Sequence, residues 1–294
     1  MGRGLFVGAI ALDLIYLVES FPNSNQKIVA LQQAVSAGGP ATNAAVTYGY
    51  LGNRAKLVGV IGSHPVSQLI HGDLKAHAVD ILDLEPNRSE SPPVSSIIVT
   101  QKSGDRAVIA INSTKRQAAV EQLPPEILQR VDVVLIDGHQ LAISRAIAQQ
   151  SSVPVVLDGG SWKEGLETVL PFIDYAICSA NFYPPGCDTH QEVITCLKDA
   201  GITKIAITGG EAPIQYSDEG NSGTLTVPSI QAVDTLGAGD IFHGAFCYYI
   251  QQQEFVGALA AAAEVASASC QFFGTRQWMQ QHDKKKDTQG KERR

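Results

Sequence analysis

Short, nearly continuous apolar runs alternate with longer amphipathic segments along most of this 294-residue chain. Runs of this kind are typical of parallel strands, because helices cover both faces of such a sheet and neither face meets water. The alternation predicts an α/β fold with a mostly parallel central sheet and helices on both sides. The expected strands cover residues 5–12, 56–61, 131–136, 153–157, 175–178 and 204–208, and the expected helices cover 41–51, 65–78, 141–150, 191–200, 238–252 and 255–273.

Two stretches, residues 14–35 and 93–112, interrupt this rhythm and are typical of strand and turn. In the second, segments 95–101 and 106–111 flank the turn sequence K-S-G-D, which is a hairpin signal. We expect the two stretches to pair as a small sheet that forms a lid on one domain spanning residues 1–282. Exposed lid strands are sheet edges that pair with another chain or need protection, so they favour a homodimer through the lid.

The charge of the chain limits its partners. Its 29 acidic residues outnumber its 22 Lys and Arg residues, which gives a formal net charge of −7. Nucleic acid and anionic membranes attract basic faces, so we expect neither as the main partner. Residues 283–294 hold six basic and three acidic residues and no apolar one, and we expect this basic tail to be disordered.

The cysteines and the apolar runs indicate a cytoplasmic protein. Five cysteines are present and none forms a C-x-x-C pair, so no zinc or thioredoxin-type motif appears. An odd number of cysteines in a domain of this size fits free thiols in a reducing compartment. The first apolar run leads directly into Asp13, so we interpret it as a core strand and not as a signal peptide. No apolar run reaches the roughly 18 residues of a membrane-spanning helix.

The strongest motif is D-T-L-G-A-G-D at residues 234–240, directly before an expected helix. Small side chains let the backbone approach a ligand closely, and successive amides at a helix N-terminus attract an anion. A carboxylate one residue beyond such amides would repel phosphate, unless it faces the group that attacks the phosphate. The pattern therefore favours phosphoryl transfer, with Asp240 as the base and the amides as an anion hole. A simple helix cap is the alternative interpretation.

A second glycine motif, A-G-G-P-A-T-N at residues 37–43, opens another expected helix. Gly38 and Gly39 offer a close backbone approach, and Asn43 offers both a donor and an acceptor, which suits sugar hydroxyls. Asp13 stands at the end of the first expected strand, where open α/β sheets bind ligands, and its carboxylate can accept two hydroxyl hydrogen bonds. The alternatives are a turn that leads into a helix with a proline in its first turn, and a solvated turn aspartate.

Together these motifs resemble the signatures of the PfkB family of carbohydrate kinases, also called the ribokinase-like family. Residues 38–43 look like its N-terminal signature, and residues 234–240 look like its C-terminal one, with Phe242 and Gly244 in register. The resemblance implies a Rossmann-like domain with a β lid and ATP-dependent phosphorylation of a sugar hydroxyl. It assigns Asp240 as catalytic base, the amides of Gly237, Ala238 and Gly239 as anion hole, and Asp13, Gly38, Gly39 and Asn43 as substrate-binding residues.

The resemblance adds two further substrate candidates. Residues 12–15 and 103–106 look most like fructokinases of the ketohexokinase type. Arg106 would then reach substrate or phosphate from the lid, and the alternative is an exposed hairpin arginine. His139 follows the expected strand 131–136 at a place where family members often put a substrate contact, and the alternative is a partly exposed loop histidine.

The nucleotide side matches the family less closely. Residues 208–210 resemble the start of its T-x-G-x-x-G turn, but Pro213 occupies the position of the last glycine. Asn181 begins a segment like the family's N-x-x-E, but the acid for magnesium and phosphate is replaced by Pro184. Asp158 is a candidate outer-shell substitute, because Mg²⁺ keeps several waters. The resemblance implies ATP, Mg²⁺ and a monovalent cation such as K⁺ as cofactors, with Asn181, Thr208, Gly210, Asp234 and Gly274 on the nucleotide side.

The sequence leaves two alternatives to a sugar kinase. A nucleoside kinase of the same fold would carry the same signatures. A non-catalytic relative that binds sugar or nucleotide should have lost Asp240 or the glycines, and both are present. The altered segments at Asn181 and Pro213 keep this second alternative open.

Overall fold

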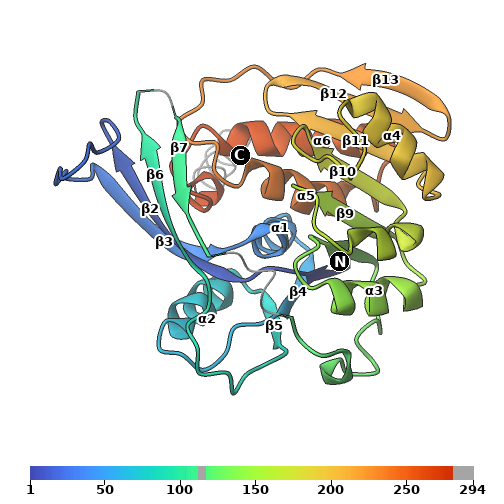
Figure 1. Cartoon of the computed structure of the whole chain (residues 1–294), viewed down its shortest axis with the longest axis horizontal. Helices are drawn as coiled ribbons and strands as arrows, with labels where there is room; N and C mark the ends of the chain where they lie inside the picture. Colours follow the sequence, from blue (N-terminus) through green and yellow to red (C-terminus); the bar gives the residue numbers. More distant parts are fainter. Residues whose placement is uncertain (103, 112–116, 281–294) are drawn as a thin grey trace, which may run out of the picture.

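The structure is a computed structural model that describes residues 1–102, 104–111 and 117–280. It contains a nine-stranded main sheet and a four-stranded small sheet, which projects from the main body in Figure 1. The described helices are α1 (Pro40–Tyr50), α2 (Ser67–Ala76), α3 (Leu141–Gln150), α4 (His190–Asp199), α5 (Ala238–Tyr249) and α6 (Phe255–Ser269), with short 3₁₀ helices at Val120–Gln122, Leu166–Thr168 and Leu170–Phe172.

The main sheet has the strand order β13-β12-β11-β10-β9-β8-β1-β4-β5. From β11 to β5 every neighbouring pair is parallel, which confirms the expected α/β fold. The strands are β1 (Arg3–Val7), β4 (Arg54–Gly59), β5 (Asp80–Asp83), β8 (Val133–Ile136), β9 (Val155–Gly159), β10 (Tyr175–Ser179), β11 (Lys204–Gly209), β12 (Ala212–Asp218) and β13 (Asn221–Leu225).

Helices bury both faces of the main sheet, and this explains the continuous apolar runs. Side chains alternate across a strand, so Phe6 of β1 belongs to the core cluster that includes α1, α5 and α6. Leu5 and Val7 belong to the cluster on the other face, which includes α3 and α4. All three residues are fully buried.

Three strands were not anticipated from the sequence. Strand β5 is short and only partly buried, and β12 and β13 form an antiparallel extension of the sheet with many exposed residues. A strand that is partly exposed does not need an apolar residue at every position, so it lacks the continuous run that identifies a strand buried on both faces.

The small sheet has the order β3-β2-β6-β7. Its strands β6 and β7 pair antiparallel, which confirms the expected hairpin. The strands are β2 (Ala11–Val18), β3 (Gln32–Gly38), β6 (Val94–Thr100) and β7 (Arg106–Ile109).

The expected first strand, residues 5–12, is in fact two strands that belong to different sheets. Strand β1 ends at Val7 and β2 begins at Ala11. A side chain at Gly8 would overlap the buried carboxylate of Asp137, which also accepts a hydrogen bond from the amide of Ala9 at 2.9 Å. This close approach turns the chain out of the main sheet, so the two strands cannot be continuous.

Part of the sequence interpretation falls outside the described residues, namely Ser103 in the expected turn, Asn112 at the end of the expected lid, and the expected basic tail at 283–294. Over the residues that are described, no helix is both long and apolar enough to cross a membrane.

Candidate active site

The motif at residues 234–240 forms the turn that starts α5. Gly237 precedes the helix in the left-handed region, with φ 71°, and Asp240 is the third residue of the helix. A side chain at Gly237 would approach the methyl group of Thr275 to 2.8 Å, so the tight turn needs glycine for both its dihedral angle and its space. The first amides of α5 therefore belong to the same helical turn as Asp240.

Asp240 is held by Asn43 from α1. Nδ2 of Asn43 donates to Oδ2 of Asp240 at 2.8 Å, and Oδ1 of Asn43 accepts from Arg276 at 2.9 Å. Burial, with the nearby charge of Asp158, raises the pKa of Asp240 to about 7. The two glycine motifs of the sequence thus meet at one carboxylate, whose pKa suits a general base near neutral pH.

Asp13 lies in the small sheet and not at the end of a main-sheet strand, which corrects the sequence interpretation. It is the third residue of β2, where it pairs in register with Ser36 of β3 and Ser95 of β6. Asp13 is only 6% exposed. Burial raises the pKa of Asp13, while a hydrogen bond from Ser95 and the charge of Arg276 oppose that rise.

A side chain at Gly38 or Gly39 would overlap neighbouring atoms. A Cβ atom at Gly38 would overlap the carboxylate of Asp13, and one at Gly39 would overlap the carbonyl oxygen of Ala9. Gly39 also has φ 103°, which favours glycine. Both glycines therefore permit the close packing of β2, β3 and the start of α1 around Asp13.

Asp137 was missed by sequence reasoning and holds this region together. Its carboxylate accepts hydrogen bonds from the amides of Ala9 at 2.9 Å, Ala41 at 3.2 Å and His139 at 2.9 Å. Burial by itself would raise the pKa of Asp137, but His139, Lys163 and the Ala9 amide together lower it to about 2. An ionised Asp137 at the first turn of α1 thus fixes the glycine turn before that helix.

His139 lies against Asp137, with its Nδ1 atom 3.1 Å from Oδ1 of the aspartate. It lines a hollow of about 830 Å³ beyond the carboxyl ends of β8 and β9. The Trp162 ring in this hollow packs edge-on against Phe182 with a centroid distance of 5.6 Å. The hollow is lined by Gln117, His139, Leu141, Ala142, Ser161, Trp162, Lys163 and Glu164.

Asp158 and His243 lie next to each other beside Asp240. Nδ1 of His243 lies 2.7 Å from the carbonyl oxygen of Gly239, and Nε2 lies 3.1 Å from that of Ile177. Both ring nitrogens of His243 therefore lie within hydrogen-bond distance of a backbone carbonyl oxygen. Oδ2 of Asp158 lies 3.4 Å from Nδ1 of His243 but accepts no hydrogen bond from the described residues. Burial raises the pKa of Asp158, and His243 opposes that rise.

The comparisons with known proteins match the whole fold. A sequence profile described as pfkB family carbohydrate kinase matches residues 2–282. The chain belongs to this family. As a pfkB kinase it is an ATP-dependent phosphotransferase with an alcohol group as acceptor, which confirms the activity expected from the two signatures.

Relatives and solved structures agree with this assignment. The chain is 24% identical to a ribokinase of Haemophilus influenzae, over 90% of this chain and 92% of the relative. It is 22% identical to a ketohexokinase of Mus musculus, over 90% of this chain and 95% of the relative. The structure of an Arabidopsis thaliana ribokinase with ribose and ATP has the same fold, with a TM-score of 0.69, 20% identity and 93% of each chain covered.

In this pfkB kinase the small sheet contacts the turn before α5 through Arg106. The exposed guanidinium donates from Nη1 to the carbonyl oxygen and to the hydroxyl of Thr235, at 2.8 and 2.9 Å. The structure therefore brings Arg106, which stays exposed, to the motif at residues 234–240.

The nucleotide-side candidates fall into two groups. Asn181, Thr208 and Gly210 follow or end the adjacent strands β10 and β11, at their carboxyl ends. Asp234 and Gly274 instead bind one another, because Oδ2 of Asp234 accepts from the Gly274 amide at 2.8 Å. Oδ1 of Asp234 accepts from the Leu236 amide at 2.9 Å. The buried Asp234 thus joins the turn before α5 to the segment after α6.

Arg276 is the other functional candidate that sequence reasoning missed. Its partners Asn43 and Asp73 lie more than 200 residues earlier in the chain, so no local pattern announces it. Only the tertiary contacts of Arg276 show its place in the site.

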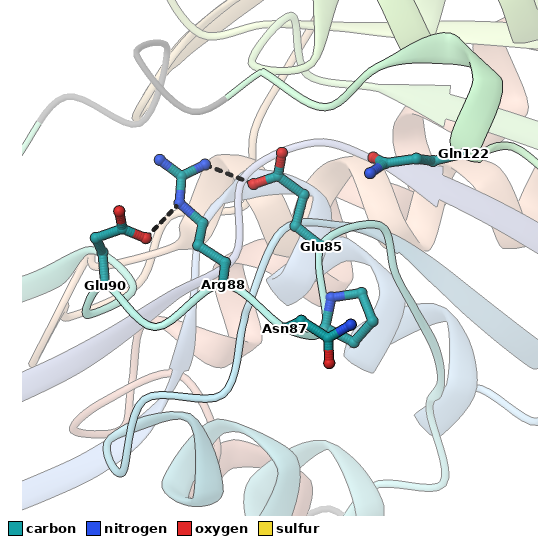
Figure 2. A pocket seen from close by; sticks show the side chains of 6 residues that line it. Glu85, Asn87, Arg88, Glu90 and Gln122 are labelled. Atoms are coloured by element: carbon teal, nitrogen blue, oxygen red, sulfur yellow. Dashed lines mark hydrogen bonds and ion pairs between the residues drawn. The ribbon is translucent and has the colours of Figure 1, made fainter.

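A separate hollow of about 500 Å³ lies beyond the end of β5 (Figure 2). Arg88 is paired there with Glu85 at 2.6 Å and with Glu90 at 3.3 Å, so these charges are already compensated. None of the predicted site residues lines this hollow. It is therefore not part of the candidate active site.

Proposed function

We propose that this kinase transfers the γ-phosphoryl group of ATP to a hydroxyl of a sugar or sugar-like molecule, with Asp240 as the general base. The observation that carries the proposal is the position of Asp240, which stands at the N-terminus of α5, hydrogen-bonded to Asn43, with its pKa raised to about 7. A base whose pKa lies near the operating pH is efficient in proton transfer.

In the proposed reaction the acceptor hydroxyl lies between Asp240 and the γ-phosphate. Asp240 takes the hydroxyl proton as the oxygen attacks phosphorus, the bond to the β-phosphate oxygen breaks, and ADP leaves. The amides of Gly237, Ala238 and Gly239 face the transferring group, and the dipole of α5 stabilises its negative charge. Phosphoryl transfer depends mainly on such positioning and charge stabilisation.

We propose that the acceptor binds between the small sheet and the start of α1. Asp13 supplies a buried carboxylate for sugar hydroxyls, and Gly38 and Gly39 let the backbone approach it. Asn43 acts on the acceptor chiefly through Asp240, because both of its polar atoms already have partners. The hollow beside His139 and Trp162 accommodates the part of the acceptor that does not react.

The same proposal places ATP over the carboxyl ends of β10 and β11, beside Asn181, Thr208 and Gly210, with Gly274 near the anion-hole turn. Among the described residues no group of three or more His, Cys, Asp or Glu is arranged to hold a metal. Mg²⁺ would therefore arrive with ATP and be held through water, and Oδ2 of Asp158 is a buried acceptor without a hydrogen-bond donor that fits this task. The proposal also includes a monovalent cation such as K⁺, which rests on the family resemblance alone.

We further propose a homodimer through the small sheet. Its edge strand β7 is exposed at every position, and Ile109 is 73% exposed there. Val29 and Val35 expose further apolar surface on the segments that lead into and form β3. Exposed apolar edge strands favour pairing with a second copy. Ile109→Lys should convert the dimer to monomer in light scattering, whereas Leu69→Lys on α2, a matched exposed apolar site, should leave it intact.

Five free cysteines support a reducing, cytoplasmic location as part of the proposal.

The activity is tested by ADP release with purified protein, Mg·ATP and separate panels of sugars and nucleosides. ADP release that requires a sugar supports the proposal, and release that requires a nucleoside identifies a nucleoside kinase. No release with any acceptor, together with a thermal shift by sugar or ATP, identifies a non-catalytic binding protein.

A further inference from the structure

We propose that Arg276 is a positioning residue for catalysis, which orients the Asn43 amide so that its NH₂ group holds the carboxylate of Asp240. The inference rests on the proposed role of Asp240 as base. Arg276 would not touch the acceptor or ATP in this role. It would act through Asn43.

The hydrogen bonds determine the direction of the Asn43 amide. Nη1 of Arg276 lies 2.9 Å from Oδ1 of Asn43, and a guanidinium only donates hydrogen bonds. The Asn43 oxygen must therefore face Arg276, and the Asn43 nitrogen faces Oδ2 of Asp240 at 2.8 Å. Without Arg276 the amide is free to turn over, and its oxygen would then repel the ionised Asp240.

Other contacts hold the guanidinium in place. Nη2 of Arg276 donates to the carbonyl oxygen of Ala37 at 2.8 Å and to Oδ2 of Asp73 at 3.1 Å. The same Asp73 oxygen accepts from the Ala37 amide at 3.0 Å. Arg276 thus joins α1, α2, the end of β3 and the segment after α6 around a single planar group.

The buried guanidinium of Arg276 is not explained by stability alone. The side chain of Arg276 is 13% exposed. Burial lowers the pKa of Arg276, while the charges of Asp73, Asp13 and Asp240 oppose that effect. Buried ion pairs contribute little net stability, because desolvation offsets the attraction between the charges. An ion pair that only joined α2 to the C-terminal segment would not need a donor directed at Asn43.

The charges around Asp240 predict the sign of the effect. Those groups come from every element that packs against it, namely Asn43 from α1, Asp13 from β2, Asp158 from β9, His243 from α5 and Arg276 after α6. Arg276 is the cation of this set that also contacts Asn43, and Asp13 and Asp158 are its anions. Loss of Arg276 removes a cation and releases the Asn43 donor, and both changes make ionisation of Asp240 harder.

The test compares Arg276→Met, Arg276→Lys and Asp73→Asn by steady-state kinetics across pH, with melting temperatures. Arg276→Met should lower kcat by about 10²-fold, as expected for a misplaced catalytic group, with a much smaller change in the KM for ATP. The acid limb of its pH–rate profile, where activity falls as Asp240 becomes protonated, should move to higher pH by about one unit or more. Arg276→Lys keeps the positive charge but loses the planar guanidinium with its two Nη donors. It should therefore lower kcat, with a smaller shift in the acid limb of the pH–rate profile.

Asp73→Asn is the matched control, because it weakens the link to α2 but leaves the bond from Arg276 to Asn43. It should lower the melting temperature without moving the acid limb. A wild-type kcat and acid limb in Arg276→Met would overturn the proposal, as would an equal movement of the limb in Asp73→Asn. If Arg276→Met does not fold, a folded Arg276→Lys decides the question, since its kcat must fall.

Asp240→Asn separates this inference from the proposed function. Normal turnover in Asp240→Asn would reject Asp240 as base and the proposed mechanism with it. An inactive Asp240→Asn combined with a wild-type acid limb in Arg276→Met would reject only the role of Arg276.

Discussion

Asn43 and Asp240, 197 positions apart in the chain, are joined by a hydrogen bond of 2.8 Å between Nδ2 and Oδ2. The bond connects the first turn of α1 with the first turn of α5, so the two glycine motifs form one site. The bond gives each motif a testable part in the proposed reaction.

Asp240→Asn should lower kcat by about 10²–10⁴-fold, the usual contribution of a positioned base. The KM values for ATP and acceptor should change little, because Asn is close in size to Asp. Folding should persist, since Asn is as suitable as Asp near a helix N-terminus. Steady-state kinetics and a thermal melt check both points, and near-normal turnover would show that Asp240 is only a helix cap.

The free energy of unfolding should depend on pH as the titration of Asp240 predicts. Its pKa rises from 3.8 to about 7 on folding, so between these values the native state binds more protons than the unfolded state. Stability from this group is therefore lost as pH rises through about 7. Asp240→Asn removes this penalty, so its melting temperature should exceed that of the wild type at pH 8 and match it more closely near pH 4. An advantage that grows at low pH would contradict the assignment.

The acid limb of kcat/KM should likewise lie near pH 7 if Asp240 is the base. Activity should fall as pH decreases below that value, because protonated Asp240 cannot accept the hydroxyl proton. A pH–rate profile with a saturating nucleotide checks this. Activity that stays constant down to pH 5 would exclude a base with this pKa.

Gly38→Ala should raise the KM for the acceptor, as Asp13→Ala should. The added methyl group would overlap the Asp13 carboxylate and displace it. The KM for ATP should stay nearly constant in both variants. Gly72→Ala on α2 is the control, because a side chain there meets nothing within 4 Å. A rise confined to the KM for ATP would place Asp13 on the nucleotide side.

Turnover should stop in EDTA, and Asp158→Asn should raise the Mg²⁺ concentration needed for half-maximal rate. Asp158 offers a buried acceptor oxygen with no hydrogen-bond donor among the described residues, which suits a metal-bound water. The thermal shift by Mg·ATP should also shrink in Asp158→Asn, and this readout does not depend on activity. Glu90→Gln, in the separate hollow, serves as control. Unchanged Mg²⁺ dependence would remove Asp158 from the metal site.

Several strands and turns of this protein could be predicted from its sequence, because they depend on residues that are close together in the chain. Continuous apolar runs such as 131–136 predicted β8 because a strand buried on both faces needs an apolar residue at every position. The turn before α5 was readable because a left-handed residue at Gly237 favours glycine. Strands β12 and β13, at the antiparallel end of the main sheet, could not be predicted, since half-exposed strands tolerate polar residues.

The sequence by itself determined the α/β alternation, the glycine turns and Asp240 as a candidate base, because each depends on residues that are neighbours in the chain. Only the tertiary structure decided that Asp13 belongs to the small sheet, that Asp137 fixes the start of α1, and that Arg276 faces Asn43. Those contacts join residues far apart in sequence. Their strength comes from burial and charge at the point where separate elements meet, and no local pattern records which elements will meet there.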